Sequence, residues 1–68
     1  MTLSARNHLV GTIDDIQWGD VVVHVTVRVG EYTIESVITR RSADEMALKK
    51  GDAVTAVVKA TEVMLSKA

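Results

Sequence analysis

The sequence predicts a small all-β domain with one short helix, in the form of a five-stranded OB-like Greek-key barrel. Two observations support this prediction. The chain has 68 residues, of which 23 are β-branched, namely 12 Val, 4 Ile and 7 Thr, and such residues favour strands. The second observation is the order of the expected elements: three strands, a helix and two strands, as in an OB-type barrel.

The first two strands are expected before and after a turn at Trp18-Gly19-Asp20. Leu9–Gln17 is the first, with Gly11 as a kink or bulge because glycine weakens a regular strand. The second, Val21–Val29, has valine at every odd position, and its even positions are Val22, His24, Thr26 and Arg28. A period of two predicts one apolar face on the core and one mixed face.

The remaining elements are a hairpin, a helix and two further strands. Gly30-Glu31 is expected to turn the chain into a third strand, Tyr32–Thr39. Ser42-Ala43-Asp44-Glu45 resembles a capping box, which predicts a short helix that continues through Leu48 and ends before Gly51. Ala53–Lys59 is expected as the fourth strand and Glu62–Leu65 as a short fifth one.

The length and composition predict a single domain over residues 1–68 that assembles with other copies of itself. A core of small side chains in so short a chain needs further support, from disulfides, metals or oligomerisation. The chain has no Cys, and its two His residues form no ligand cluster, so oligomerisation remains. No apolar run is long enough for a membrane span, and the first residues lack the apolar core of a signal peptide, so a cytoplasmic location is expected.

Enzymes and nucleic-acid binders both fit the sequence poorly. The chain contains no Cys nucleophile, no recognisable Ser-His-carboxylate spacing and no glycine-rich phosphate loop, so no catalysis is expected. An OB-type barrel that binds single-stranded nucleic acid needs stacking aromatics and a basic groove. The chain has one Trp, one Tyr, no Phe and a net charge of −1.

Hydrogen-bond donors and positive charge gather at the expected strand ends. Ser4 and Arg6 project from one face of an extended segment, and the guanidinium of Arg6 suits an oxyanion. The other candidates for binding an oxyanion are Thr39, Ser42, Lys59, Ala60 and Thr61. This set contains no carboxylate, so it would suit a tetrahedral dianion. Each residue also has an ordinary structural interpretation: a helix cap for Ser42, turn formers for Ser and Thr, and solvated charges for Arg6 and Lys59.

Several segments resemble the molbindin family, small molybdenum-pterin-binding-type (Mop) proteins with a TOBE-like fold. The resemblance covers nearly the whole chain and rests on Ser4-Ala5-Arg6-Asn7, Gly11-Thr12, Val37-Ile38-Thr39, Leu48-Lys49-Lys50-Gly51 and the segment 58–65 (VKATEVML). It implies an OB-like barrel that assembles into a hexamer, a trimer of dimers. It also implies molybdate or tungstate as ligand, held between subunits and stored or buffered, with no organic cofactor.

By motif, the resemblance assigns ligand binding to Ser4 and Arg6, to Thr39 and Ser42, and to Lys59, Ala60 and Thr61, with part of the set supplied by a neighbouring chain. The alternative is a non-catalytic structural or regulatory β module that assembles through protein contacts without an anion. Oxyanion affinity distinguishes the two hypotheses.

Overall fold

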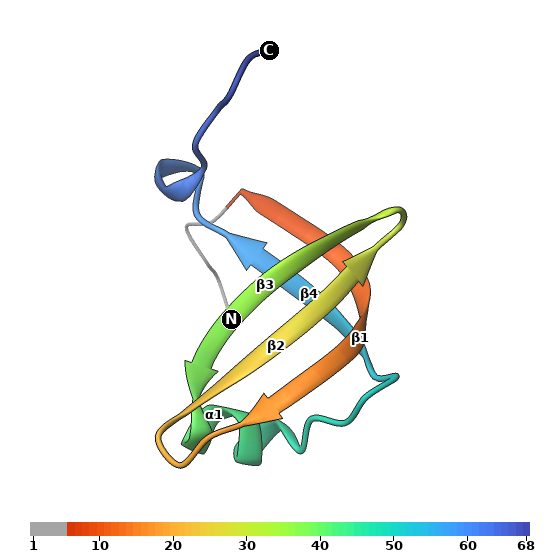
Figure 1. Ribbon diagram of the computed structural model, residues 1–68, viewed down its shortest axis with the longest axis vertical. Helices are drawn as coiled ribbons and strands as arrows, with labels where there is room; N and C mark the ends of the chain where they lie inside the picture. The colour runs from red at the N-terminus through yellow and green to blue at the C-terminus, as the bar shows by residue number, and fades with distance from the viewer. Residues whose placement is uncertain (1–5) are drawn as a thin grey trace.

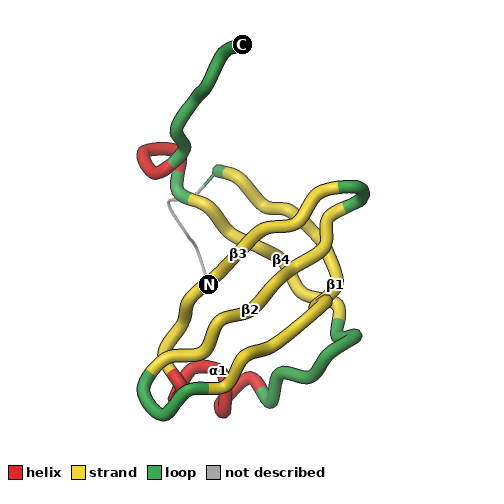
Figure 2. Tube along the Cα trace, in the orientation of Figure 1, coloured by secondary structure: helices red, strands yellow, loops and turns green. Residues whose placement is uncertain are grey.

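The computed structural model describes residues 6–68 and contains one antiparallel sheet of four strands with a short helix (Figures 1 and 2). The elements are β1 (Asn7–Trp18), β2 (Val22–Val29), β3 (Tyr32–Thr39), α1 (Arg40–Met46), β4 (Ala53–Val58) and the 3₁₀ helix η1 (Ala60–Glu62). The strand order is β3-β2-β1-β4, a Greek-key order, because β4 returns to pair with β1. None of the described helices has the length and apolar character of a membrane-spanning segment.

The core lies against the inner face of β2, as its alternating valines predict. Val23, Val25 and Val27 are at most 4% exposed, and they pack with Ile13 of β1 and Ala43 of α1. On the opposite face, His24 contacts the carboxylate of Glu35 on β3, which also accepts a hydrogen bond from Thr26. One buried face and one polar face are therefore present, as the period of two requires.

β1 bends and pairs with two other strands. Its first half, Asn7–Thr12, pairs with β4, and its second half, from Thr12 to Trp18, pairs with β2. The register shifts between Ile13 and Asp15, so the bulge lies just after the predicted kink at Gly11. A Cβ on Gly11 would lie 2.4 Å from the carbonyl oxygen of Arg28, so glycine is needed here for close approach of the two backbones.

The loop before β4 completes the hydrogen bonding of the bend in β1. The Ile13 N–H donates to the Asp52 carbonyl at 2.9 Å, and the Gly51 N–H donates to the Ile13 carbonyl at 2.8 Å. The Asp52 carboxylate in turn accepts from the Lys49 N–H at 2.9 Å. These bonds fix where β4 begins, and hence which half of β1 it covers.

The predicted capping box is wrong, because helix α1 begins earlier and its N-cap is Thr39. Thr39 has the extended backbone that an N-cap requires, and its side chain accepts the Ser42 N–H. The predicted end is also too late. Ala47 adopts a left-handed conformation with φ 51°, and its N–H and that of Leu48 bond back to the last turn. The helix ends there, and Leu48 packs against the core.

The predicted fifth strand at Glu62–Leu65 is also not formed, and the described chain has four strands. Glu62 ends η1, and the residues that follow belong to no strand. β3 and β4 form the two edges of the sheet and are not hydrogen-bonded to each other, so the barrel is open between them. The apolar residues Val63, Met64 and Leu65 have no strand partner in the described chain, which is the physical reason that the prediction fails.

Candidate functional site

Four of the predicted oxyanion residues lie together at one end of the sheet, which we call the open end. Asn7 pairs with Val58, so Arg6 and Lys59 are neighbours just beyond the last pair of the β1–β4 ladder. Lys59 is the N-cap of η1, and Ala60 and Thr61 are its first two residues. All four are exposed. Ser4, the remaining candidate from this part of the sequence, lies outside the described residues.

The open end presents cations and backbone donors. In η1, the Glu62 N–H bonds to the Lys59 carbonyl and the Val63 N–H bonds to the Ala60 carbonyl. The N–H groups of Ala60 and Thr61 precede these bonds and are not used within the helix, as at any helix start. Arg6 supplies a planar fork of donors and Lys59 a compact charge. The arrangement can therefore offer several hydrogen bonds to an anion.

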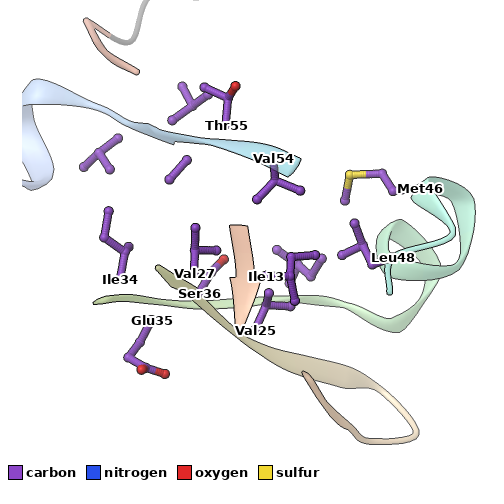
Figure 3. Close-up of a pocket in the computed structure, with 14 residues that line it drawn as sticks. Ile13, Val25, Val27, Ile34, Glu35, Ser36, Met46, Leu48, Val54 and Thr55 are labelled. Atoms are coloured by element: carbon purple, nitrogen blue, oxygen red, sulfur yellow. The ribbon is translucent and has the colours of Figure 1, made fainter. Parts of the chain in front are cut away.

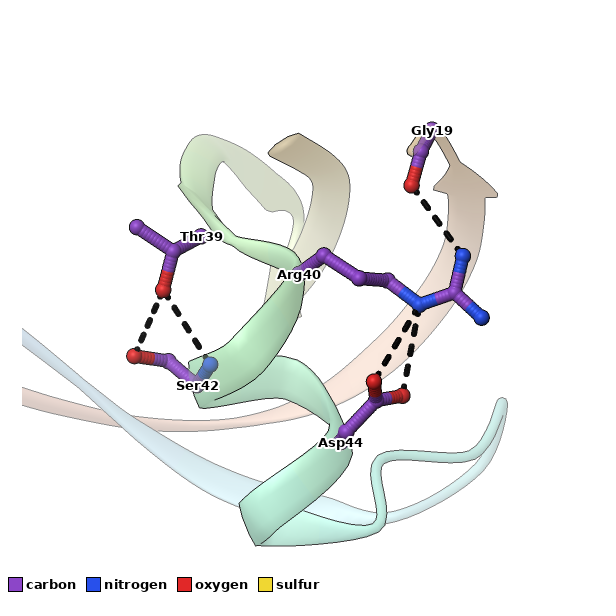
Figure 4. Close-up of polar contacts among 5 residues, drawn as sticks. All are labelled: Gly19, Thr39, Arg40, Ser42 and Asp44. Atoms are coloured by element: carbon purple, nitrogen blue, oxygen red, sulfur yellow. Dashed lines mark hydrogen bonds and ion pairs between the residues drawn. The ribbon is translucent and has the colours of Figure 1, made fainter. Parts of the chain in front are cut away.

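The other two predicted residues, Thr39 and Ser42, lie at the opposite end of the sheet, beside α1, which we call the helix end (Figure 4). The Thr39 hydroxyl accepts from the Ser42 N–H at 3.1 Å and donates to the Ser42 Oγ at 2.9 Å. Both functions of the Thr39 hydroxyl are thus used locally. Because the Ser42 Oγ accepts the proton of Thr39, Ser42 keeps its own hydroxyl proton as a donor for a ligand.

The cations of the helix end are already paired. The Arg40 Nε lies 3.3 Å from both carboxylate oxygens of Asp44, and its Nη1 donates to the Gly19 carbonyl at 3.2 Å (Figure 4). The same guanidinium lies over the Trp18 ring, 5.0 Å from its centroid. Arg41 pairs with Glu45. The depression beside Thr39, which these pairs line together with Asp20, therefore carries both signs of charge and is not an anion site by itself.

The two groups do not meet within one chain. β1 runs from Asn7, beside Val58, to Trp18, which pairs with Val23, and Thr39 pairs with Val22. The register therefore puts Arg6 and Lys59 at one end of the sheet and Thr39 and Ser42 at the other (Figure 1). A site that uses both groups requires at least two copies of the chain.

Sequence reasoning missed an apolar groove between the sheet edges. The groove has a volume of about 350 Å³ and lies where the barrel fails to close. Ile34 and Ser36 of β3 line one side of it and Val54 of β4 the other, and Met46 and Leu48 lie at its α1 end (Figure 3). The only signal in the sequence was the pattern of Tyr32–Thr39, in which both faces of the strand carry apolar as well as polar residues. Such a pattern is typical of a strand covered on both faces.

Metal coordination by side chains finds no support in residues 6–68, where no group of three or more His, Cys, Asp or Glu residues could hold an ion. Neither of the two aromatic residues belongs to the open end as defined above. Trp18 contacts Arg40 at the helix end, and Tyr32 begins β3 at the β2–β3 hairpin.

Comparison with known proteins places this chain in a family. Residues 3–65 match the model of the TOBE domain. The chain is 39% identical over 66 residues to molybdenum-pterin-binding protein 2 of Clostridium pasteurianum, covering 96% of this chain and 97% of that protein. A molybdate-binding protein from Sporomusa ovata has a structure that superposes with a TM-score of 0.93, at 36% identity, over 98% of this chain and all of that one.

A third similarity is to the cytoplasmic molybdate-binding protein ModG, in a crystal form with molybdate bound. It superposes with a TM-score of 0.81 at 39% identity, and it covers 88% of this chain and 43% of the longer ModG chain. The predicted resemblance is thereby confirmed over nearly the full length. The chain belongs to the TOBE-domain family, within its group of small molybdenum-pterin-binding proteins, the molbindins.

Proposed function

We propose that this protein binds molybdate or tungstate without catalysis, as a single domain over residues 1–68, and stores or buffers the anion in the cytoplasm. The observation that carries the proposal is the agreement of two independent features. The chain matches a molybdate-binding protein from Sporomusa ovata over 98% of its length and the molybdate-binding protein ModG over 88%. Its described candidate residues are all donors or cations, gathered at the two ends of one sheet.

The proposed site lies between copies of the chain. Arg6, Lys59 and the N–H groups of Ala60 and Thr61 come from the open end of one copy, joined by Ser4. Ser42, held by Thr39, comes from the helix end of another. The separation of the two groups within one chain supports this arrangement. A hexamer built as a trimer of dimers is the proposed assembly.

The bare oxyanion is favoured over a pterin as the ligand. A pterin ring needs aromatic stacking, and Trp18 is already covered by the guanidinium of Arg40. A dianion needs only charge-assisted hydrogen bonds, each worth roughly 1.5–3 kcal/mol. The open end can supply such bonds from two cations and two backbone amides.

Isothermal titration with molybdate, with sulfate as competitor, tests the proposal when native mass is measured on the same sample. The expected result is molybdate binding to an oligomer that excess sulfate does not displace. A well-formed oligomer that gives neither heat nor a mass shift with molybdate or tungstate would contradict the proposal. It would favour the alternative of a non-catalytic structural or regulatory β module.

A further inference from the structure

The two consecutive arginines at the start of α1 are held in different ways. The side chain of Arg40 is held on three sides, by a carboxylate, a backbone carbonyl and an aromatic ring (Figure 4). Among the described residues, the side chain of Arg41 bonds only to Glu45, with 3.3 Å between Nε and Oε1. The Arg41 side chain is 89% exposed, against 43% for Arg40. Arg41 is therefore the cation of the helix end that can change its partner.

Arg41 and Glu45 line the shallow depression beside Thr39, which has a volume of about 560 Å³. The charged residues of this depression are Asp20, Arg40, Arg41, Asp44 and Glu45. Its carboxylates outnumber its guanidiniums by one, so the depression as it stands repels a dianion. Ser42, the proposed ligand from this end, directly follows Arg41 in the chain. A dianion at Ser42 would therefore be favoured by a guanidinium that leaves its carboxylate.

The contact between Arg41 and Glu45 is weak enough for an oxyanion to replace it. A pair of exposed charges four residues apart on a helix changes an equilibrium constant by only about twofold. One charge-assisted hydrogen bond to a dianion is worth about tenfold or more. Exchange of Glu45 for a dianion is therefore favourable for Arg41, whereas Arg40 would lose three contacts in the same exchange.

We propose that Arg41 is a further ligand of the oxyanion, bound to Glu45 while the anion is absent, and that Glu45 lowers the affinity by competing for it. This inference rests on the proposed function, because it requires an oxyanion beside Ser42. Arg41 precedes Ser42, so its long side chain can turn toward the anion without a change in the backbone of α1. Its planar fork of donors suits an oxyanion, and the Glu45 side chain, 68% exposed, remains in water.

The exchange predicts that the two partners of this ion pair affect binding in opposite directions. Arg41→Ala removes a donor to the anion and should weaken binding. Glu45→Gln removes the competing carboxylate and should strengthen it. If the pair served only to stabilise α1, both substitutions would break the same contact and would change the affinity in the same direction.

Isothermal titration of the full chain with molybdate, at about 0.15 M ionic strength, tests the inference, because charges more than about 8 Å apart are largely screened there. Arg41→Ala is expected to weaken binding about tenfold, the value of one charge-assisted hydrogen bond. Arg41→Lys keeps the charge and should recover part of this loss. Glu45→Gln is expected to bind about two- to threefold more tightly, since the twofold cost of releasing Arg41 is gone. Wild-type affinity in Arg41→Ala, or a change of the same sign in Arg41→Ala and Glu45→Gln, would overturn the inference.

Asp44→Asn is the matched control for the loss of a negative charge. It removes a carboxylate from the same depression, but Arg40 stays on the Gly19 carbonyl and the Trp18 ring. Its affinity is expected to equal that of the wild type, and a gain as large as that of Glu45→Gln would overturn the inference in favour of a general field effect. A wild-type chain that binds no oxyanion would contradict the proposed function as well as this inference, whereas an unchanged Arg41→Ala beside a binding wild type overturns the inference alone.

Discussion

The polar side chains at the helix end have partners within the chain, whereas those at the open end are exposed. At the helix end, Arg40 joins Asp44, the Gly19 carbonyl and the Trp18 ring, and Thr39 caps the helix through both functions of its hydroxyl. At the open end, Arg6 and Lys59 are exposed, and the chain after Val63 makes no hydrogen bond to the described residues. The polar groups that stabilise the fold thus lie at the helix end, and those available to a ligand or a second copy lie at the open end.

This separation predicts that substitutions at the two ends change different measured quantities. Substitutions at the helix end should lower the free energy of unfolding, and among them a change at Thr39, which holds Ser42, should lower oxyanion affinity as well. Substitutions at the open end should lower oxyanion affinity and leave unfolding unchanged. The bend in β1 connects the two ends, so a change there should alter both quantities.

The largest effect is expected at the bend, from Gly11→Ala. The new Cβ would lie 2.4 Å from the Arg28 carbonyl oxygen and 2.9 Å from side-chain carbons of Val27 and Val29. Such overpacking costs about 1–3 kcal/mol, and here we expect the upper part of that range because backbone must move. Urea unfolding measures it. Gly30→Ala is the control: it has open space but φ +61°, so about 1 kcal/mol is expected. Equal costs for the two variants would contradict the close-approach argument.

At the open end, Lys59→Ala should weaken molybdate binding by roughly 10- to 100-fold, the value of one charge-assisted hydrogen bond. Arg6→Ala should have an effect of the same order. Neither variant should change the urea midpoint, because both side chains are exposed. Lys50→Ala, an exposed lysine in the loop before β4, is the matched control and should bind as the wild type does. Wild-type affinity in both site variants would refute the assignment.

At the helix end, Thr39→Val should cost about 1 kcal/mol of unfolding free energy, since the N-cap of α1 is lost. It should also weaken molybdate binding, because the Ser42 hydroxyl loses the donor that orients it. Thr39→Ser keeps the hydroxyl and should restore both quantities. If Thr39→Ser binds as poorly as Thr39→Val, the hydroxyl by itself does not position the site.

The smallest effect is expected from Arg40→Ala, at about 0.5–1 kcal/mol, the value of an exposed cation–π contact. The Trp18 fluorescence should change as well, since the guanidinium leaves the ring. Arg41→Ala is the control, because its side chain is 89% exposed and pairs only with Glu45 among the described residues. A fluorescence change of equal size in the control would argue against a specific Arg40–Trp18 contact.

The strands of this fold could be predicted from their side-chain periodicity, and the helix cap could not. The valines of β2 define its buried face whatever lies next to it. The cap was ambiguous, because Thr39 and Ser42 are both good capping residues three positions apart. The choice depends on where β3 ends, and that is set by its pairing with Val22, a contact between distant residues. Short-range patterns do not contain this information.

The residues of the candidate site could be predicted from the sequence, but their positions relative to one another could not. Donors and cations at strand ends could be identified one by one from the sequence. Their division between opposite ends of the sheet follows from the register of β1 with β2 and β4. The fifth strand failed for a related reason. The apolar pattern of Val63–Leu65 favours an extended segment, but it does not say whether the partner strand lies in the same chain.

The chain enters the sheet at Arg6 and leaves it at Lys59, and these two positions are neighbours. Two copies encoded in one gene could be joined by the residues that follow Lys59 in the first copy and precede Arg6 in the second. Such a fusion replaces a bimolecular encounter by an intramolecular one, at an effective concentration that reaches the millimolar range for short linkers. Assembly would then no longer depend on dilution. A tandem form of this domain should keep its paired state at concentrations where the separate chains dissociate.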